Sequence, residues 1–330
     1  MNRRQVDLSL RARLEELHAL REELGPLHKV TERIGALEAE LGEGYQMQRD
    51  LIFRVLSLGH AQLAELIGAR GPNIQMNAAC ASTTLAVNLA GDWIAQGRCR
   101  RVLVVGADDI TNPVLAPLLM GGLMATGALS TEKNLSLAAL PFDRRRNGMI
   151  PGMGAVGLVV EDAEAVQARG LNPLTRLLGS EIANSAFHGT RLDAGHIADI
   201  MERFIARMEA QHGLDRASLA RQTVFVSHET YTPARGGSAS AEVAALRRAF
   251  GEHARHIVIA NTKGFTGHPM AAGIEDAAAA RMLQFGQVPP IANHQERDPE
   301  LGELNLSAGG AYPVRYALRL AAGFGSQLAL

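Results

Sequence analysis

From residue 45 onward, apolar segments with the length of strands alternate with segments that have the periodicity of helices. This alternation constrains the fold most, because it is typical of an α/β protein whose helices cover both faces of its sheets. The expected strands are residues 74–79, 101–106, 153–161, 174–183, 223–228, 256–261, 303–307 and 313–321. The expected helices are residues 45–68, 82–96, 194–212, 239–249 and 270–285. The continuously apolar run at 101–106 is expected to be buried in a parallel sheet.

The first 44 residues have a different pattern. Apolar side chains recur there every three or four positions among Arg and Glu, which is helical spacing. They are Leu10, Leu14, Leu17, Leu24, Leu27, Val30, Ile34, Leu37 and Leu41. Gly25-Pro26 interrupts the pattern, so we expect a pair of helices that packs on its own core. An intermolecular coiled coil is the less favoured alternative, because the heptads are few and interrupted.

Composition excludes several classes of protein. The 33 basic residues nearly balance the 34 acidic ones, which argues against wholesale binding of nucleic acid or anionic membranes. Two cysteines are too few for a disulfide framework and favour a reducing compartment. No uncharged apolar run is long enough to span a bilayer, and charged residues follow the first methionine instead of an apolar signal segment. We therefore expect a soluble, cytoplasmic protein.

An extended apolar segment ends abruptly at Cys80, and small helix-forming residues follow at once. This pattern predicts a strand, a sharp turn and a helix, with the thiol near the first helical turn. Unpaired backbone N–H groups and the helix dipole stabilise a thiolate there, and the thiolate is the nucleophilic form of cysteine. A lone cysteine is more commonly a buried structural residue. Cys99, just before a strand, is given that interpretation.

Two histidines lie where predicted strands end. One strand ends at His228, and the strand 256–261 is followed by Lys263 and His268. Open α/β sheets bind their ligands at the carboxyl ends of strands, so we expect these side chains to share one site with Cys80. A cysteine, two histidines and a lysine in this placement favour a nucleophilic catalytic site over isolated structural residues. No metal site is predicted.

Three motifs resemble the active-site motifs of the β-ketoacyl-ACP synthases, the condensing enzymes of fatty-acid, polyketide and polyunsaturated-fatty-acid synthesis. They are Asn-Ala-Ala-Cys80-Ala-Ser, Ser-His228-Glu-Thr-Tyr-Thr-Pro and Thr-Lys263-Gly-Phe-Thr-Gly-His268. The resemblance covers about residues 50–330 and implies the layered αβαβα arrangement of the thiolase-like fold. It implies an N-terminal half at 45–165 with the nucleophile and a C-terminal half at 166–330 with the histidines, after a helical segment at 1–44.

The resemblance implies a decarboxylative Claisen condensation of a malonyl-carrier thioester with an acyl group bound to Cys80. A thiolate accepts the acyl group and later leaves, because sulfur is both a good nucleophile and a good leaving group. N–H groups of His228 and His268 would stabilise the enolate that forms on decarboxylation, as an oxyanion hole does. The acyl groups would arrive on the phosphopantetheine of an acyl carrier protein or carrier domain, so no cofactor bound by this chain is expected.

The resemblance also assigns supporting roles. Gly323-Phe324-Gly325 resembles the glycine-rich loop that closes the acyl site, and the backbone N–H groups of Phe324 and Cys80 would form a second oxyanion hole. Lys263 would orient the site electrostatically through an acidic partner. Glu242 is the best candidate for that partner, with an exposed carboxylate on the helix 239–249 as the alternative.

The chain departs from the family pattern at several positions. Glu229 follows His228 where the family usually has glycine, and Asn147 replaces the usual aspartate. The C-terminal Gly-Phe-Gly-Ser-Gln lacks the customary Gly-Thr-Asn continuation. Cys80 also lies nearer the start than in a complete family member, so the first half of the fold is expected to lack its opening strand–helix–strand. These departures favour a divergent subfamily that resembles ketosynthase domains of polyketide or polyunsaturated-fatty-acid synthases.

Two alternatives remain. A thiolase is less favoured, because thiolases usually carry a second catalytic cysteine near the C-terminus and this chain has none there. A non-catalytic partner of the chain-length-factor type would lack the nucleophile, whereas this chain keeps Cys80, both histidines and Lys263. A chain without its first strand–helix–strand could still be inactive with these motifs intact. Thiol labelling separates the two, because a reactive, low-pKa Cys80 supports the enzyme and an inert one supports the partner. The apolar residues 74–79 and the Gly-, Met- and Leu-rich passage 108–150 carry more apolar surface than one sheet sandwich needs. Together with the resemblance, they predict a two-fold homodimer whose active sites borrow residues from the mate.

Overall fold

The computed structural model describes residues 3–24, 28–42, 58–111, 115–233 and 238–330. These residues belong to two compact units, 1–75 and 76–330. Most of the predicted helix 45–68 lies outside the described residues. Its described end is helix α3 (Gly59–Ile67), which stops at Gly68 in the left-handed conformation that glycine adopts freely. The predicted boundaries after residues 44 and 165 stay predictions.

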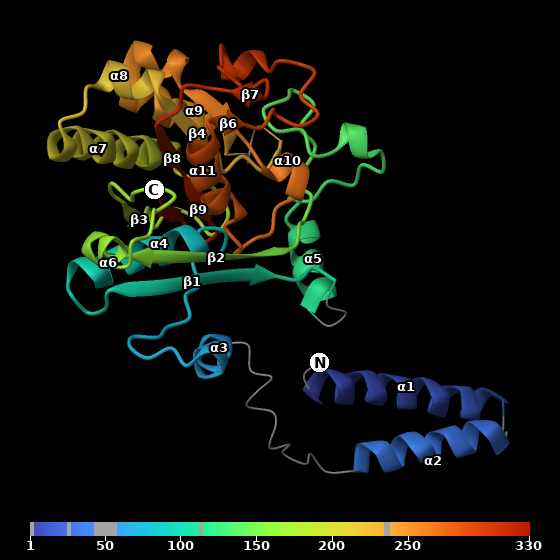
Figure 1. Ribbon diagram of the computed structural model, residues 1–330. Coiled ribbons are helices and arrows are strands. Elements are labelled where there is room, and N and C mark those ends of the chain that lie inside the picture. The colour runs from blue at the N-terminus through green and yellow to red at the C-terminus, as the bar shows by residue number, and fades with distance from the viewer. Residues whose placement is uncertain (1–2, 25–27, 43–57, 112–114, 234–237) are drawn as a thin grey trace. The chain divides into compact units, whose positions relative to one another are not determined.

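Helices α1 (Arg3–Leu24) and α2 (His28–Gly42) run side by side in opposite directions (Figure 1). Leu10, Ile34 and Leu37 are 8%, 3% and 1% exposed and form the seam between the two helices. The predicted helix pair with a core of its own is therefore confirmed. The interrupting Gly25-Pro26 lies outside the described residues.

The centre of the unit 76–330 is a parallel sheet in the order β5 (Val258–Ala260), β4 (Thr223–Val226) and β8 (Tyr316–Arg319). An antiparallel sheet continues from it along the chain, in the order β3 (Ile182–Asn184), β10 (Gln327–Ala329) and β9 (Ala321–Gly323). Two antiparallel pairs complete the strands: β1 (Arg101–Asp108) with β2 (Gly154–Glu161), and β6 (Gln287–Val288) with β7 (Gly310–Ala311).

Helices cover both faces of the central sheet. Helices α7 (Ala194–His212) and α9 (Ala239–Phe250) share one apolar core with Phe225 of β4. Helix α11 (Ile274–Phe285) lies on the other face and packs with Val224 and Val226. Successive side chains of a strand point to opposite faces, so an unbroken apolar run such as β4 serves both cores.

Helix α4 (Ser82–Ala95) and α11 pack on the inner face of the β1–β2 pair (Figure 1). The outer face of this pair is apolar and exposed: Leu103, Val105 and Val159 are 45%, 50% and 61% exposed. Within the described part of residues 76–330, the layers are therefore helix, sheet, helix and sheet, four of the five predicted by an αβαβα arrangement. The remaining helical elements are α5 (Leu115–Ala125), α6 (Ala163–Ala168), α8 (Arg216–Arg221), α10 (Lys263–Thr266), η3 (Leu135–Leu137), η4 (Gly251–His256) and η5 (Pro299–Leu301).

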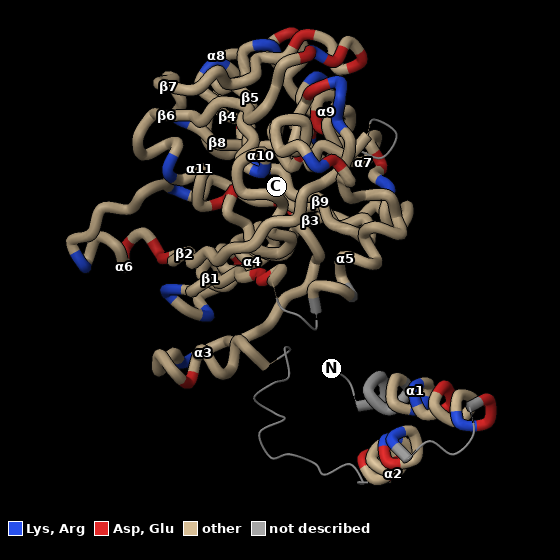
Figure 2. The backbone as a smooth tube through the Cα atoms, turned by 90° about the vertical axis from the view of Figure 1, so that its right-hand side faces the viewer, with Lys and Arg blue, Asp and Glu red and all other residues tan. Residues whose placement is uncertain are grey.

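Four predicted strands differ from the structure. Only the last two residues of 174–183 belong to a strand, β3, and residues 303–307 contribute only an isolated bridge between Leu306 and Ile259. The run 101–106 forms a strand, but its neighbour is antiparallel and one of its faces is exposed, so the predicted burial in a parallel sheet is wrong. Residues 74–79 form no strand, and Ile74 is 54% exposed. A strand needs a hydrogen-bonded neighbour, and none lies beside residues 76–79 in the described structure. Basic and acidic positions are interspersed along the described chain (Figure 2).

Candidate active site

Cys80 lies at a tight turn directly before helix α4. Ala79 has φ +49°, a left-handed conformation that costs energy for a residue other than glycine. Ser82 holds the turn in place, because its Oγ accepts from the Ala78 N–H at 2.9 Å and donates to the Ala79 carbonyl oxygen at 2.6 Å. Strand β9 packs against the same turn so closely that a Cβ at Gly323 would collide with the Ala78 carbonyl oxygen. The predicted sharp turn is confirmed, with Cys80 just outside the helix and not in its first turn.

The thiol of Cys80 is protonated at neutral pH. Burial raises its pKa above the ordinary value of 9.0, and the nearby Lys263 ammonium only partly opposes that rise. The predicted low-pKa thiolate is therefore wrong in direction. Desolvation disfavours the charged form, and here it outweighs the favourable charge of the lysine.

Lys263 fixes the protonation of His228. Its Nζ lies 3.1 Å from His228 Nδ1 and donates to the His228 carbonyl oxygen at 2.9 Å. A lysine ammonium has three donors and no acceptor, so Nδ1 of His228 must be the acceptor. The ring proton then resides on Nε2, which forms no hydrogen bond in the described structure. Burial and then the charge of Lys263 lower the pKa of His228 well below 6.5, so the ring is neutral.

His268 lies beside this ring. The two ring centroids are 5.7 Å apart and the rings are nearly perpendicular. His268 is 2% exposed, and neither of its ring nitrogens has a hydrogen-bond partner among the described residues. Burial and then Lys263 lower its pKa, so it is also neutral. An unpaired buried imidazole is costly, and its free N–H is available to a substrate oxygen.

The acidic partner of Lys263 is Glu275 of helix α11, and the predicted pairing with Glu242 is wrong. The Lys263 Nζ to Glu275 Oε1 distance is 3.2 Å, and Arg319 approaches the other carboxylate oxygen at 3.8 Å. Glu242 accepts instead from the Ser227 hydroxyl at 2.5 Å and from the His228 N–H at 3.2 Å. It is 1% exposed, so the alternative of an exposed carboxylate is also wrong. Glu242 thus anchors the backbone at His228.

The Gly323-Phe324-Gly325 loop is held by residues 184–190. The Gly325 N–H donates to the Gly189 carbonyl oxygen at 2.8 Å, and the Asn184 side chain donates to the Gly325 carbonyl oxygen at 2.8 Å. The backbone N–H groups of Cys80 and Phe324 donate to no backbone carbonyl in the described structure. The Cys80 N–H interacts with its own thiol, and the Phe324 N–H is available to a substrate oxygen.

Sequence reasoning missed two groups of buried charges. Glu275 and Arg319 surround Lys263, and the acidic first turn of the predicted helix 270–285 was the one available signal for Glu275. The ion pairs of Arg146 with Glu229 and Asp298 join segments distant in the sequence, and no local pattern predicts them.

Two other residues were singled out in the sequence, Asn147 and Cys99. Asn147 stabilises the segment 130–147, because its side chain accepts from the Ser130 hydroxyl and donates to the Leu137 carbonyl oxygen. Cys99 is half-buried and lies in the connection between α4 and β1.

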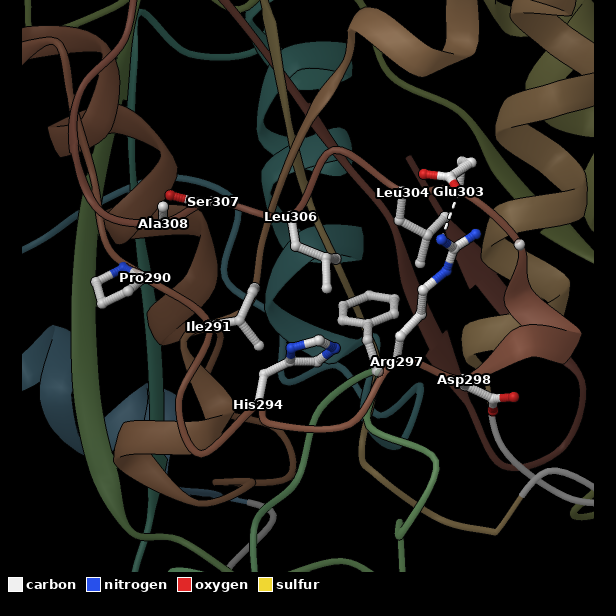
Figure 3. A pocket seen from close by; sticks show the side chains of 12 residues that line it. Pro290, Ile291, His294, Arg297, Asp298, Glu303, Leu304, Leu306, Ser307 and Ala308 are labelled. Carbon is white, nitrogen blue, oxygen red and sulfur yellow. Dashed lines mark ion pairs between the residues drawn. The ribbon is translucent and has the colours of Figure 1, made fainter.

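A cavity of about 450 Å³ lies between the segments 290–298 and 302–308, and Asp298 is one of the residues that line it (Figure 3). Phe142, Ile291 and Leu306 form apolar walls, and Arg297 pairs with Glu303 at its rim. None of the predicted site residues lines it. In the part of the chain that the structure describes, no cluster of His, Cys, Asp or Glu has the arrangement of a metal site, and no helix is both long and apolar enough to cross a membrane.

Comparisons with known proteins agree with this geometry. Residues 39–165 match the family model described as "Beta-ketoacyl synthase, N-terminal domain", and residues 180–295 match "Beta-ketoacyl synthase, C-terminal domain". The first match contains Cys80, and the second contains His228, Lys263 and His268.

Two curated relatives and one solved structure illustrate the similarity. The chain is 31% identical over 271 residues to 3-oxoacyl-(acyl-carrier-protein) synthase 2 of Staphylococcus aureus (strain COL), covering 80% of this chain and 62% of that protein. It is 31% identical over 247 residues to putative polyketide beta-ketoacyl synthase 1 of Streptomyces virginiae, covering 73% of this chain and 54% of that protein. The chain thus spans less than two thirds of the length of these relatives.

The solved structure is a type II PKS ketosynthase in complex with its acyl-carrier protein and bound to the hexaketide. It superposes with a TM-score of 0.76 at 26% identity, over 88% of this chain and 71% of that chain. The predicted thiolase-like α/β fold is therefore confirmed. Both family models, the curated relatives and the fold agree, and the chain belongs to the β-ketoacyl synthase family.

Proposed function

We propose that this chain is a β-ketoacyl synthase, an acyltransferase that condenses a malonyl-carrier thioester with an acyl group held on Cys80. The observation that carries the proposal is the neutral histidine pair. Lys263 leaves the proton of His228 on Nε2, and the neighbouring His268 has no protein partner for its ring nitrogens. Two N–H donors without protein partners on buried side chains suit an enolate oxygen.

In the first half-reaction, the sulfur of Cys80 attacks the carbonyl carbon of an acyl thioester. The carbonyl oxygen becomes an oxyanion that accepts from the backbone N–H groups of Cys80 and Phe324. The carbon–sulfur bond to the carrier then breaks, and the carrier thiol leaves with the proton that Cys80 gave up. The acyl group is now a thioester of Cys80.

In the second half-reaction, the malonyl thioester carbonyl accepts from Nε2–H of His228 and from an N–H of His268. The bond between the malonyl carboxylate and the α-carbon breaks, CO₂ leaves, and its electron pair forms the enolate. The α-carbon attacks the acyl carbonyl carbon, and the carbon–sulfur bond to Cys80 breaks. The product is a β-ketoacyl thioester on the carrier, and the Cys80 thiolate takes up one proton from solvent to become the thiol again.

The partners follow from the same chemistry. The solved ketosynthase with a TM-score of 0.76 is in complex with an acyl-carrier protein, which supports a carrier protein or domain as the partner of this chain. Delivery on phosphopantetheine needs no cofactor bound by the chain itself. A homodimer and a cytoplasmic location complete the proposal, and light scattering of the purified protein tests the dimer.

Intact-protein mass spectrometry tests the proposed function. Wild-type protein incubated with acyl-carrier thioesters of several chain lengths should gain the mass of one acyl group, and added malonyl-carrier should yield a β-ketoacyl thioester. Cys80→Ala should gain no mass, whereas the control Cys99→Ala should behave like wild type. A folded wild-type protein that takes up no acyl group from any donor would favour a non-catalytic partner subunit.

A further inference from the structure

Glu229 follows His228 directly and is fully buried at the junction of several segments. Its N–H donates to Ser227 Oγ at 2.8 Å, and its carbonyl oxygen accepts from Asn261 Nδ2 at 2.8 Å. Asn261 in turn accepts from the Gly264 N–H in helix α10, next to Lys263. The main chain of Glu229 is thus tied to the strand that precedes it and to the segment that carries Lys263.

The carboxylate of Glu229 caps helix α9. Its Oε2 accepts from the Ala239 N–H at 2.8 Å and from the Ser238 hydroxyl at 3.1 Å. Ser238 is the N-cap residue, but its own side chain makes no capping hydrogen bond. A helix N-terminus leaves backbone N–H groups without partners and favours a negative charge. Glu229 therefore provides the capping hydrogen bond for α9 that the N-cap residue Ser238 does not make.

The other carboxylate oxygen faces a buried cation. Glu229 Oε1 lies 3.5 Å from Arg146 Nε, and Arg146 Nη2 lies 2.7 Å from Asp298 Oδ2. The side chains of Arg146 and Asp298 are 3% and 8% exposed. Asp298 Oδ1 accepts from the Glu300 N–H at 2.9 Å and so caps η5. Three buried ionisable side chains thus connect the 290–300 segment to the residue beside His228. Burial and then the charge of Glu242 raise the pKa of Glu229 to about 7, and Arg146 partly opposes that rise.

We propose that Glu229 is a positioning residue for decarboxylation, and that it holds His228 in place through its contacts with α9, Arg146 and Asp298. The inference rests on the proposed function and adds to it a residue at a position where the resembled family usually has glycine. Glu229 acts through His228 and does not touch the substrate. Removing one partner from a buried charge group leaves another charge uncompensated, so the loop should shift to relieve it.

The nucleophile is positioned by different contacts. Ser82 holds the Cys80 turn, Gly323 of β9 packs on it, and Thr84 of α4 donates to Asp276 of α11 at 3.0 Å. None of these contacts involves Glu229, Arg146 or Asp298. A change at Glu229 should therefore slow the histidine-dependent decarboxylation more than the acylation of Cys80. A general loss of stability would instead slow both steps alike.

The test compares two steps in the same variants. In the native protein one carboxylate oxygen of Glu229 faces Arg146 and the other accepts from the Ala239 N–H. Glu229→Gln replaces one of these oxygens by an NH₂ group, which cannot accept a hydrogen bond. That NH₂ group must therefore face either Arg146 or the Ala239 N–H. Asp298→Asn keeps the cap of η5 but places its amide toward Arg146. Malonyl decarboxylation and single-turnover acylation of Cys80 are measured for each variant. The control is Glu209→Gln, which loses a partly buried ion pair with Arg216 that includes none of the site residues.

We expect Glu229→Gln to lower kcat for decarboxylation by about 10- to 100-fold, since small displacements of catalytic groups have effects of this size. The KM for the malonyl thioester and the acylation rate should stay within about threefold. Asp298→Asn should change in the same direction by less, and Glu209→Gln should leave the ratio of the two steps unchanged.

Two results would overturn the inference. One is an unchanged decarboxylation rate in folded Glu229→Gln, and the other is an equal loss of both steps, which indicates a structural role only. If Glu229→Gln does not fold, the ratio of the two steps in Asp298→Asn decides in the same way. Failure of the wild-type protein to decarboxylate malonyl thioesters would refute the proposed function itself. This outcome is measured on the wild-type protein alone, so it is distinct from any effect of the variants.

Discussion

Replacement of Lys263 by methionine separates the structural from the chemical role of the lysine. Burial would raise the pKa of Glu275, but Lys263 and then Arg319 outweigh it and hold the pKa at about 2, against an ordinary 4.5. One pKa unit corresponds to about 1.4 kcal/mol. The groups around Glu275 therefore favour its carboxylate by about 3 kcal/mol. Burial nevertheless lowers the pKa of Lys263 from its ordinary 10.5, although Glu275 opposes that change, so the pair offsets only part of the desolvation of the lysine. Breaking a buried pair by removing one partner costs roughly 3–5 kcal/mol. Lys263→Met should lower the free energy of unfolding at pH 7 by about 3 kcal/mol.

Lys263→Met also removes the hydrogen bond that fixes the tautomer of His228. Without a donor at Nδ1, the ring proton is free to move from Nε2, so one N–H toward the substrate is no longer assured. Loss of a single oxyanion-hole donor lowers rates by about 10²–10³, and we expect this loss of decarboxylation in Lys263→Met. The double variant Lys263→Met/Glu275→Gln leaves no unpaired carboxylate, so it should regain most of the stability and none of the decarboxylation.

The assay is urea unfolding at several pH values together with malonyl decarboxylation. The pKa of Glu275 is lower in the folded protein than in the unfolded chain, so its contribution to stability is complete above about pH 4.5 and is lost as the pH falls toward 2. That acid-range loss should shrink in Lys263→Met. Recovery of decarboxylation in the double variant would refute the tautomer argument, and an unchanged stability of Lys263→Met would refute the pairing argument.

Three further predictions concern the nucleophile and the histidines. Cys80→Ala should abolish covalent acyl transfer without unfolding the protein, whereas Cys99→Ala should do neither; acylation that survives Cys80→Ala, followed by mass spectrometry, would disprove the assignment. Because burial raises the pKa of the Cys80 thiol, its alkylation by iodoacetamide should still accelerate as the pH rises past 9.0, and a plateau below pH 8 would show a thiolate instead. His228→Ala and His268→Ala should each lower malonyl decarboxylation by about 10²–10³ and Cys80 acylation by much less; equal loss of both steps would make one histidine the general base of the thiol.

Local sequence pattern predicted the parts of the fold that depend on local interactions. The apolar run before His228 forms β4, and the segment 153–161 forms β2 almost as expected. Residues 74–79 have the same apolar, extended character and form no strand, because a strand also needs a neighbour that its own sequence does not specify. The run 101–106 was predicted to be buried on both faces, but one face of β1 is exposed. An apolar run is compatible with one or two buried faces, so its sequence alone does not distinguish the two cases.

The site was predictable in its reacting groups and not in its buried charges. Motifs near strand ends identified Cys80, His228, Lys263 and His268, and the structure brings the two histidines and the lysine together. The choice between Glu242 and Glu275 as the partner of Lys263 depends on how α9 and α11 pack on opposite faces of the sheet, which spacing along the chain does not encode. The pKa of Cys80 depends on desolvation by distant segments, and the local helix signal pointed in the opposite direction.

A single-turnover condensation tests the central claim most directly. Protein acylated on Cys80 is purified, mixed with one equivalent of malonyl-carrier thioester, and analysed for released CO₂, for the β-ketoacyl thioester and for the mass of the protein. We predict equal amounts of CO₂ and β-ketoacyl thioester, and the return of Cys80 to its free mass at the same rate. Acyl groups that stay on Cys80 beside intact malonyl thioester, or that leave as the free acid without a new carbon–carbon bond, would contradict the assignment of this chain as a decarboxylative condensing enzyme.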